Sequence, residues 1–210
     1  MRKRKATHLI IVLCVCSVIT AGCAILQAGE EVTPGPGMSA RVLDASAFRE
    51  DWVLCMGPWP PPDRAAGERG ESDSLYVQFC HDAEECRDFG AEQGLFLYRD
   101  EAAANAAFDR DFSLREFPDL GTSMLTGWNV PDEWAYQSRV ADELEFACAE
   151  VDIDRVGPPE WRCKCVARYA QYISTLNSVL SPQCMSLRDL AQVLEAIDAR
   201  MALQSGNRPE

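Results

Sequence analysis

The sequence predicts an α+β domain built mainly on an antiparallel sheet. Strand-like runs follow one another without intervening helices in the second half, an amphipathic helix closes the chain, and cysteines are frequent. Parallel sheets alternate strands with helices, whereas consecutive strands favour antiparallel pairing. We therefore expect a sheet with one internal helix, a C-terminal amphipathic helix packed on it, and disulfides that staple the domain.

The N-terminal segment has the features of an export signal. Basic residues 2–5 precede an apolar run over residues 9–21, whose length suits the apolar core of a secretory signal. Thr20-Ala21-Gly22-Cys23 resembles the lipobox of bacterial lipoproteins, with Thr20 where that family has a large aliphatic residue. The resemblance implies cleavage before Cys23 and a diacylglyceryl group on its thiol. The alternative is a signal that stays uncleaved as a membrane anchor.

These features divide the chain into four parts. Residues 1–22 are expected to be the signal peptide, and residues 23–40 the lipid anchor with a flexible linker that is rich in glycine and proline. Residues 41–203 are expected to form a single extracytoplasmic α+β domain. Residues 204–210 should form a frayed tail.

The first part of the domain is predicted to begin with a short helix. Phe48 and Trp52 stand four residues apart, which favours a helix over residues 45–53. The proline-rich residues 57–63 that follow favour a long loop with a polyproline II start.

A strand, a second strand and a helix come next. Apolar residues predict strands over 75–80 and 95–98. Asp100 offers a side-chain cap to a helix over residues 101–112. The apolar stripe of this helix is expected to be Ala104, Phe108 and Phe112.

The second half is predicted to be rich in strands and to end in a helix. We expect strands over 134–139 and 144–150, a long β segment over 161–176, and turn residues over 177–184. Ser186 and Asp189 predict a capping box at the start of the last helix. The expected buried face of that helix is Leu187, Leu190, Leu194, Ile197 and Met201.

Of the 10 cysteines, seven follow Cys23 and allow at most three internal disulfides. Cys148 lies in one expected strand and Cys163 and Cys165 lie in the next, so we expect Cys148 to pair with one of these two. One further pair is expected within a cluster in the other half, formed by Cys55, Cys80 and Cys86.

Composition and motifs argue against several classes of function. The net charge of -13 disfavours nucleic-acid binding, because acidic surfaces repel phosphates. We find no motif for a metal or a cofactor and expect none. His81 is the only histidine beyond the signal, so a serine or cysteine hydrolase would depend on it. Abundant carboxylates leave a hydrolase open without nominating a particular pair.

The favoured function is therefore a non-enzymatic binding or sensing domain, anchored by lipid in a bacterial envelope. The order of strands and helices resembles extracytoplasmic lipoprotein and PsbP-like domains, and this resemblance implies no site residues. Trp128 and Trp134 are the candidates for a groove that takes a sugar, a peptide or another unknown ligand. The alternatives are a secreted hydrolase that uses carboxylates or His81, and a structural envelope component with a protein partner.

Overall fold

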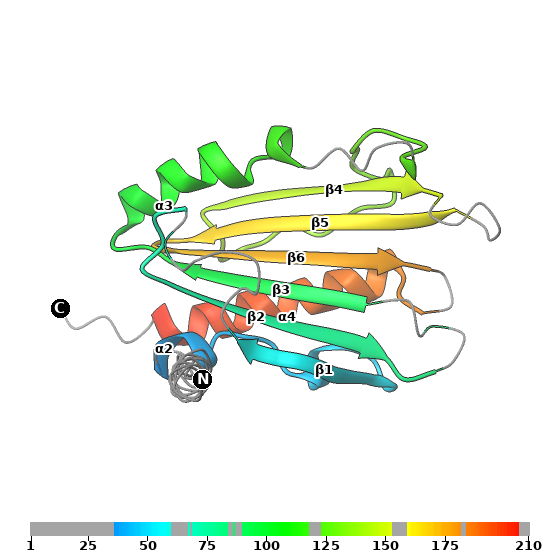
Figure 1. The fold of residues 1–210 in the computed structure, drawn as a ribbon, viewed down its shortest axis with the longest axis horizontal. Coiled ribbons are helices and arrows are strands. Elements are labelled where there is room, and N and C mark those ends of the chain that lie inside the picture. The colour runs from blue at the N-terminus through cyan, green and yellow to red at the C-terminus, as the bar shows by residue number, and fades with distance from the viewer. Residues whose placement is uncertain are drawn as a thin grey trace, which may run out of the picture. The chain divides into compact units, whose positions relative to one another are not determined.

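The computed structural model describes residues 36–59, 67, 69–83, 86, 90–117, 123–152, 159–181 and 184–205. All of them belong to one unit, Pro34–Glu210. Within these residues six antiparallel strands form one sheet in the order β1-β2-β3-β6-β5-β4 (Figure 1). The strands are β1 (Trp52–Trp59), β2 (Asp73–His81), β3 (Gly90–Leu97), β4 (Glu143–Val151), β5 (Glu160–Tyr169) and β6 (Tyr172–Leu180).

Short helical segments and one long helix accompany the sheet. The long helix is α4 (Leu187–Ser205), and α3 (Glu101–Ala107) continues into the π-helical turn η3 (Phe108–Phe112). The remaining segments are α2 (Pro36–Ser39), η1 (Ala45–Ala47) and η4 (Leu114–Glu116). The fold is therefore α+β, as the sequence predicts.

The two faces of the sheet are buried by different helices. Alternate strand residues point to opposite faces, and the apolar ones on one face pack against α4 in the larger core. We call this face the α4 face. The opposite face, the α3 face, carries a second cluster that α3 and η3 cover. The largest side chains of that cluster are Phe96, Tyr98, Phe108, Phe112 and Phe117.

The helix predictions for α3 and α4 are confirmed. Asp100 accepts a hydrogen bond from the backbone N–H of Ala103 at 2.7 Å. Ser186 and Asp189 cap each other's backbone N–H groups at 3.2 and 2.9 Å, so Asp replaces the usual Glu of a capping box without loss of the motif. Ala104, Phe108 and Phe112 are buried in the first helix, as expected, and so are Leu190, Leu194, Ile197 and Met201 in the second. Leu187, also expected on that buried face, is only partly buried against the same core.

The predicted helix over 45–53 and loop over 57–63 are wrong in their described parts. The helical segment is only η1, and β1 begins at Trp52 and runs through Pro58 to Trp59. Phe48 and Trp52 do stack, with ring centroids 5.0 Å apart, so the four-residue spacing reflects a contact made across a turn. An edge strand tolerates Pro58 because one side of β1 needs no ladder hydrogen bonds.

The predicted strand over 134–139 is also wrong, because that segment is irregular. The predicted segment over 161–176 is two strands, β5 and β6, joined by a tight turn at Ala170. Ala170 has a φ of 51°, a region that few residues other than Gly adopt. Its N–H donates to the Asp142 carboxylate at 2.6 Å. A distant side chain therefore stabilises a turn that has no glycine or proline signal.

Three disulfides join described cysteines, and all lie toward one end of the sheet. They are Cys148–Cys163, Cys55–Cys80 and Cys86–Cys184. Cys148 thus takes the first of the two partners that its spacing allows, and the cluster of three supplies one internal pair. The bond from Cys86 to Cys184 is not among those that the sequence predicts, and Cys165 remains a buried free thiol.

The segment predicted as linker contributes to the core at its end. Met38 in α2 is buried against β2 and its neighbours. The signal and Cys23 lie outside the described residues, as does the tail from residue 206 onward.

Candidate ligand-binding site

A row of polar side chains crosses the part of the α3 face that the aromatic cluster leaves open. The strand register places Gln78 opposite Glu92, Glu92 opposite Asn177, and Asn177 opposite Lys164. Directly opposed residues on antiparallel strands have Cβ atoms about 4.5–5.5 Å apart. The four side chains therefore form a continuous line over β2, β3, β6 and β5.

The surface beside this row is hollowed. The hollow has a volume of about 460 Å³, within the range of pockets that take small molecules. Gly90 lines it without a side chain, which leaves space above β3. We call it the polar hollow, and its polar and aromatic lining is Gln78, Glu92, Trp128, Arg162, Lys164, Asn177 and Ser178.

Trp128 is held at the hollow by a segment that extends the sheet beyond β4. Asn129 and Cys148 exchange backbone hydrogen bonds of 2.9 and 2.8 Å, and the amide side chain of Asn129 donates to the carbonyl of Gly127 at 2.9 Å. The Trp128 ring meets Phe117 edge to face, with centroids 5.3 Å apart. Backbone pairing and ring packing together fix the indole as one wall of the hollow.

Lys164 is fixed by the same aromatic pair. Its ammonium lies 4.6 Å from the centroid of the Phe117 ring, a distance typical of a cation–π contact. Lys164 therefore lies where the polar hollow meets the aromatic cluster. It is also the only lysine after Lys5 in the whole chain.

Arg162 and Arg168 lie on the same strand and the same face, yet their surroundings differ. Arg168 pairs with Asp142 at 3.2 Å, Glu143 at 3.1 Å and Glu101 at 3.7 Å. Arg162 forms no ion pair with any carboxylate among the described residues, and its buried Nε has no hydrogen-bond partner there. The Nε of Arg168 is likewise unpartnered, but its terminal nitrogens are neutralised.

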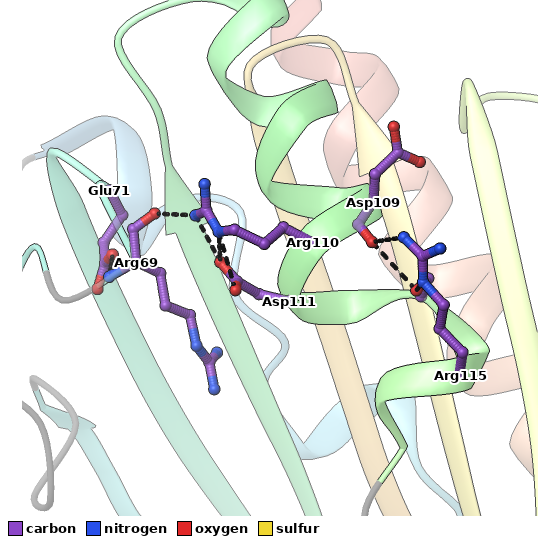
Figure 2. A network of polar contacts seen from close by, with 7 residues as sticks. Arg69, Glu71, Asp109, Arg110, Asp111 and Arg115 are labelled. Atoms are coloured by element: carbon purple, nitrogen blue, oxygen red, sulfur yellow. Dashed lines mark hydrogen bonds and ion pairs between the residues drawn. The ribbon is translucent and has the colours of Figure 1, made fainter.

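Aromatic rings fill the opposite end of the α3 face, and arginine side chains lie beside them. Arg110 donates to the carbonyl of Arg69 at 3.0 Å and pairs with Asp111 at 2.6 Å. Figure 2 shows these contacts side by side. The Arg69 guanidinium lies 4.7 Å from the centroid of Phe112 and 5.3 Å from that of Phe96. These contacts fill this end of the α3 face, which we call the closed end.

Gly94 separates the two ends. A Cβ at this position would lie 2.6 Å from the Thr175 hydroxyl and 3.2 Å from the rings of Tyr76 and Phe96. Tyr76 faces Gly94 across the strand pair. The missing side chain thus lets an aromatic ring lie close to the sheet between the cluster and the hollow.

The structure does not bring the two predicted tryptophans into one groove. Trp128 lines the polar hollow on the α3 face, whereas Trp134 stacks on Phe146 with centroids 3.7 Å apart and packs against the α4 core. Tyr136, two residues further on, donates to the buried carboxylate of Asp198 at 2.7 Å. These contacts explain why the segment around Trp134 is held without strand pairing.

The other residues considered for chemistry, His81 and the cysteines, occupy structural settings. Nδ1 of His81 accepts a hydrogen bond from the N–H of Ala83 at 3.1 Å, and its ring meets Trp52 edge to face. Burial raises the pKa of the Cys165 thiol, and the nearby Asp198 carboxylate adds to this shift, so the reactive thiolate is disfavoured. No group of three potential metal ligands occurs among the described residues.

Two further observations bear on location. The three disulfides indicate an extracytoplasmic protein, because such bonds persist mainly in oxidising compartments. Among the described helices, none is both long and apolar enough to cross a bilayer.

Sequence reasoning misses Gln78, Glu92, Arg162 and Asn177 as site residues and treats Lys164 only as a neighbour of the cysteines. Each is an ordinary polar residue in a strand, and nothing in its local sequence marks it. The only signal is the register that places them side by side, which requires knowing that β3 pairs with β6 across a long gap in sequence.

Comparisons with known proteins give similarity to solved structures but not to protein families. No family model matches the chain, and no curated protein matches it. The fold is similar to the crystal structure of the extracellular domain of PknH from Mycobacterium tuberculosis, with a TM-score of 0.48 and 9% identity. The match covers 84% of this chain and 99% of that one. At this level the similarity assigns no function to this protein.

Proposed function

We propose that this protein is a non-enzymatic binding or sensing domain of a bacterial envelope, and that the polar hollow is its ligand site. The observation that carries this proposal is the polar hollow itself. Opposite charges, two amides and a fixed indole converge there on a cavity of about 460 Å³. Small-molecule sites combine an apolar wall with a few placed polar groups in this way.

The placement in the envelope rests on the N-terminal sequence and on the disulfides. A signal that ends in Ala21-Gly22-Cys23 supplies both export and a diacyl anchor in this proposal. Two acyl chains hold a protein stably at a membrane, whereas one chain holds it only marginally. The domain then needs no apolar surface of its own for attachment.

Catalysis is disfavoured by the setting of His81. A general base must be able to reach the proton that it removes, but the Nδ1 of His81 is occupied by a backbone N–H and the ring packs on Trp52. His81 is also absent from the lining of the polar hollow. The hollow contributes one carboxylate, Glu92, whereas glycoside hydrolysis ordinarily uses a pair.

Ligand binding is tested with the full-length protein, purified in detergent from membranes. Thermal unfolding is recorded with neutral sugars, acidic sugars, amino acids and short peptides, each in large excess. A ligand at about 100 times its Kd stabilises the folded state by about 2.7 kcal/mol. Trp128→Ala should abolish that shift. Trp161→Ala, which alters the other face of β5, should retain it.

Two outcomes would contradict binding at this site. Either no compound of the panel shifts the unfolding temperature, or a shift survives in Trp128→Ala. Turnover of a panel compound that is lost in His81→Ala would instead establish the hydrolase alternative.

The anchor is tested separately by incorporation of labelled palmitate. We expect label in the wild-type protein and none in Cys23→Ser, which should also leave the membrane fraction. A Cys23→Ser protein that is processed and partitions like the wild type would exclude lipid attachment at this residue.

A further inference from the structure

The charged residues that line the polar hollow are mostly positive, whereas the net charge of the chain is negative. The chain has a net charge of -13, yet the charged residues that line the hollow are two cations, Arg162 and Lys164, and one anion, Glu92. Charges that line a cleft attract ligand groups of the opposite sign. Two cations and one anion therefore favour a ligand that carries an anionic group.

Arg162 is the group that most needs an acceptor. Its Nε is buried and unpartnered, and no described carboxylate neutralises its guanidinium. A guanidinium carries five N–H donors in a planar fork that matches a carboxylate. A buried donor without a partner costs free energy that a bound acceptor would recover.

Glu92 lies at a defined distance from the cations. β6 separates β3 from β5, so the backbones that carry Glu92 and Lys164 are two strand spacings apart, or roughly 9–10 Å. Asn177 lies between them and donates to Glu92 at 3.4 Å. A ligand that spans this interval meets a cationic pole, an amide and then an anionic pole.

We infer that the polar hollow takes a small organic carboxylate that carries a hydrogen-bond donor a few atoms away. Its carboxylate contacts Arg162 and Lys164, its donor contacts Glu92, and its carbon skeleton lies against Trp128. Amino acids and sugar acids share this chemistry, with an ammonium or a hydroxyl as the donor. This inference rests on the proposed function, because it assumes that the hollow binds a ligand.

The experiment compares each acid with a neutral or uncharged-end relative on the full-length protein. Calorimetry is run with glucuronate against glucose, and with alanine against alaninamide. We expect the acid of at least one pair to bind about tenfold or more tightly than its relative, since a charge-assisted contact is lost in the latter. Binding of the acid should weaken as salt is raised.

Matched variants place the anion in the hollow. Lys164→Gln and Arg162→Gln should each weaken binding of the acid about tenfold or more. Arg99→Gln removes an exposed cation outside the hollow, whose side chain is 82% exposed, and should leave affinity within about twofold. If Arg162→Gln fails to fold, Lys164→Gln alone decides the point.

Glu92→Gln distinguishes the two sources of the shared chemistry. An ammonium next to Glu92 loses a charge partner in this variant, so alanine should weaken about tenfold. A hydroxyl can still donate to the amide oxygen, so glucuronate should weaken much less.

The outcomes separate this inference from the proposed function. Equal binding of acid and relative, lost in Trp128→Ala, would overturn the carboxylate and leave the hollow as a ligand site. An acid preference that Arg162→Gln and Lys164→Gln both leave intact would also overturn it. Failure of these four probes and of the whole panel would remove both proposals together.

Discussion

The two ends of the α3 face are built from the same strands but stabilised in different ways. At the closed end, aromatic rings fill the space under α3 and η3, and Arg168 is paired with three carboxylates. At the open end, polar side chains line a hollow, Arg162 has no described ion pair, and disulfides brace the surrounding strands and loops. Stability without a filled core leaves a cavity available for a ligand.

This difference has a general physical basis. A small core supplies stability by excluding water, and any space left for a ligand reduces that contribution. Cross-links stabilise without filling space, because they act mainly on the unfolded chain. The closed end therefore stabilises the domain by packing, and the open end keeps a polar surface available for a ligand. Substitutions at each end can test this difference.

The largest expected effect is at the closed end. Phe112 is 2% exposed and packs on Phe96 with centroids 5.1 Å apart. Phe112→Ala removes a buried ring and leaves a cavity, so it should lower the free energy of unfolding by about 3–5 kcal/mol. Urea denaturation monitored by circular dichroism measures the change. Leu114→Ala, at a side chain that is 37% exposed, is the matched control and should cost far less.

A loss for Phe112→Ala that is no larger than for Leu114→Ala would show that the closed end is not a packed core. Where the variant stays folded, ligand binding at the open end should be unchanged, which would sharpen the separation between the two ends.

The second effect concerns the brace at the open end. Cys148–Cys163 closes a loop of 15 residues, worth about 3 kcal/mol in the chain-entropy model. The double variant Cys148→Ala/Cys163→Ala should lose about that amount in urea denaturation without reductant. Cys165→Ala keeps the disulfide and serves as the control, so reductant should destabilise it but change the double variant less.

Equal stability of the double variant and the wild type in the oxidised state would mean that this bond does not brace the hollow. The open end would then depend on its remaining disulfides or on backbone pairing alone.

The third effect compares two arginines of one strand. Arg168→Gln leaves three carboxylates without their cation and should cost about 1–2 kcal/mol. The expected cost is at the low end for charged contacts, because the partners are 38% to 62% exposed and water screens them. Arg162→Gln breaks no described ion pair and should cost clearly less. Thermal denaturation at low and high salt measures the loss of stability in both variants. The difference between the two losses should become smaller at high salt. Equal losses would erase the proposed contrast.

The sequence predicts the covering layers of this molecule better than the site between them. The spacing of Ala104, Phe108 and Phe112 and the cap from Asp100 are local patterns, and both are realised in the structure. Strand pairing is not local. The turn at Ala170 is stabilised by Asp142, which is distant in sequence, and no residue within the turn predicts it.

The polar hollow shows the same limit more strongly. Apart from Trp128, its residues come from four strands, and each would be an ordinary solvated position if the sheet were paired in another order. A shift of one residue in register moves a side chain to the other face. Trp128 stands out in the sequence because it is large and aromatic near a loop, whereas Arg162 carries no such mark.

The smallest effect at neutral pH is expected at Tyr98, which lies buried in the closed end. Its hydroxyl has no hydrogen-bond partner among the described residues. Tyr98→Phe should therefore change stability little at pH 7, or raise it slightly, since no buried donor is left unsatisfied. Tyr169→Phe is the contrast, because its hydroxyl donates to Asp198 at 2.7 Å, and its loss should cost about 1.5–3 kcal/mol.

The Tyr98 hydroxyl should affect stability at alkaline pH, although it has little effect at neutral pH. Burial raises the pKa of Tyr98 in the folded state, and the Glu71 carboxylate adds to the rise, whereas an unfolded tyrosine titrates near 10. The unfolded state thus releases its proton first. Stability present below pH 10 falls above it by up to about 1.4 kcal/mol per pH unit from this group. Denaturation between pH 8 and 11 should show a shallower decline for Tyr98→Phe than for the wild type. Parallel declines would mean that the closed end admits water to this hydroxyl, and the contrast with the open end would then be one of shape rather than of hydration.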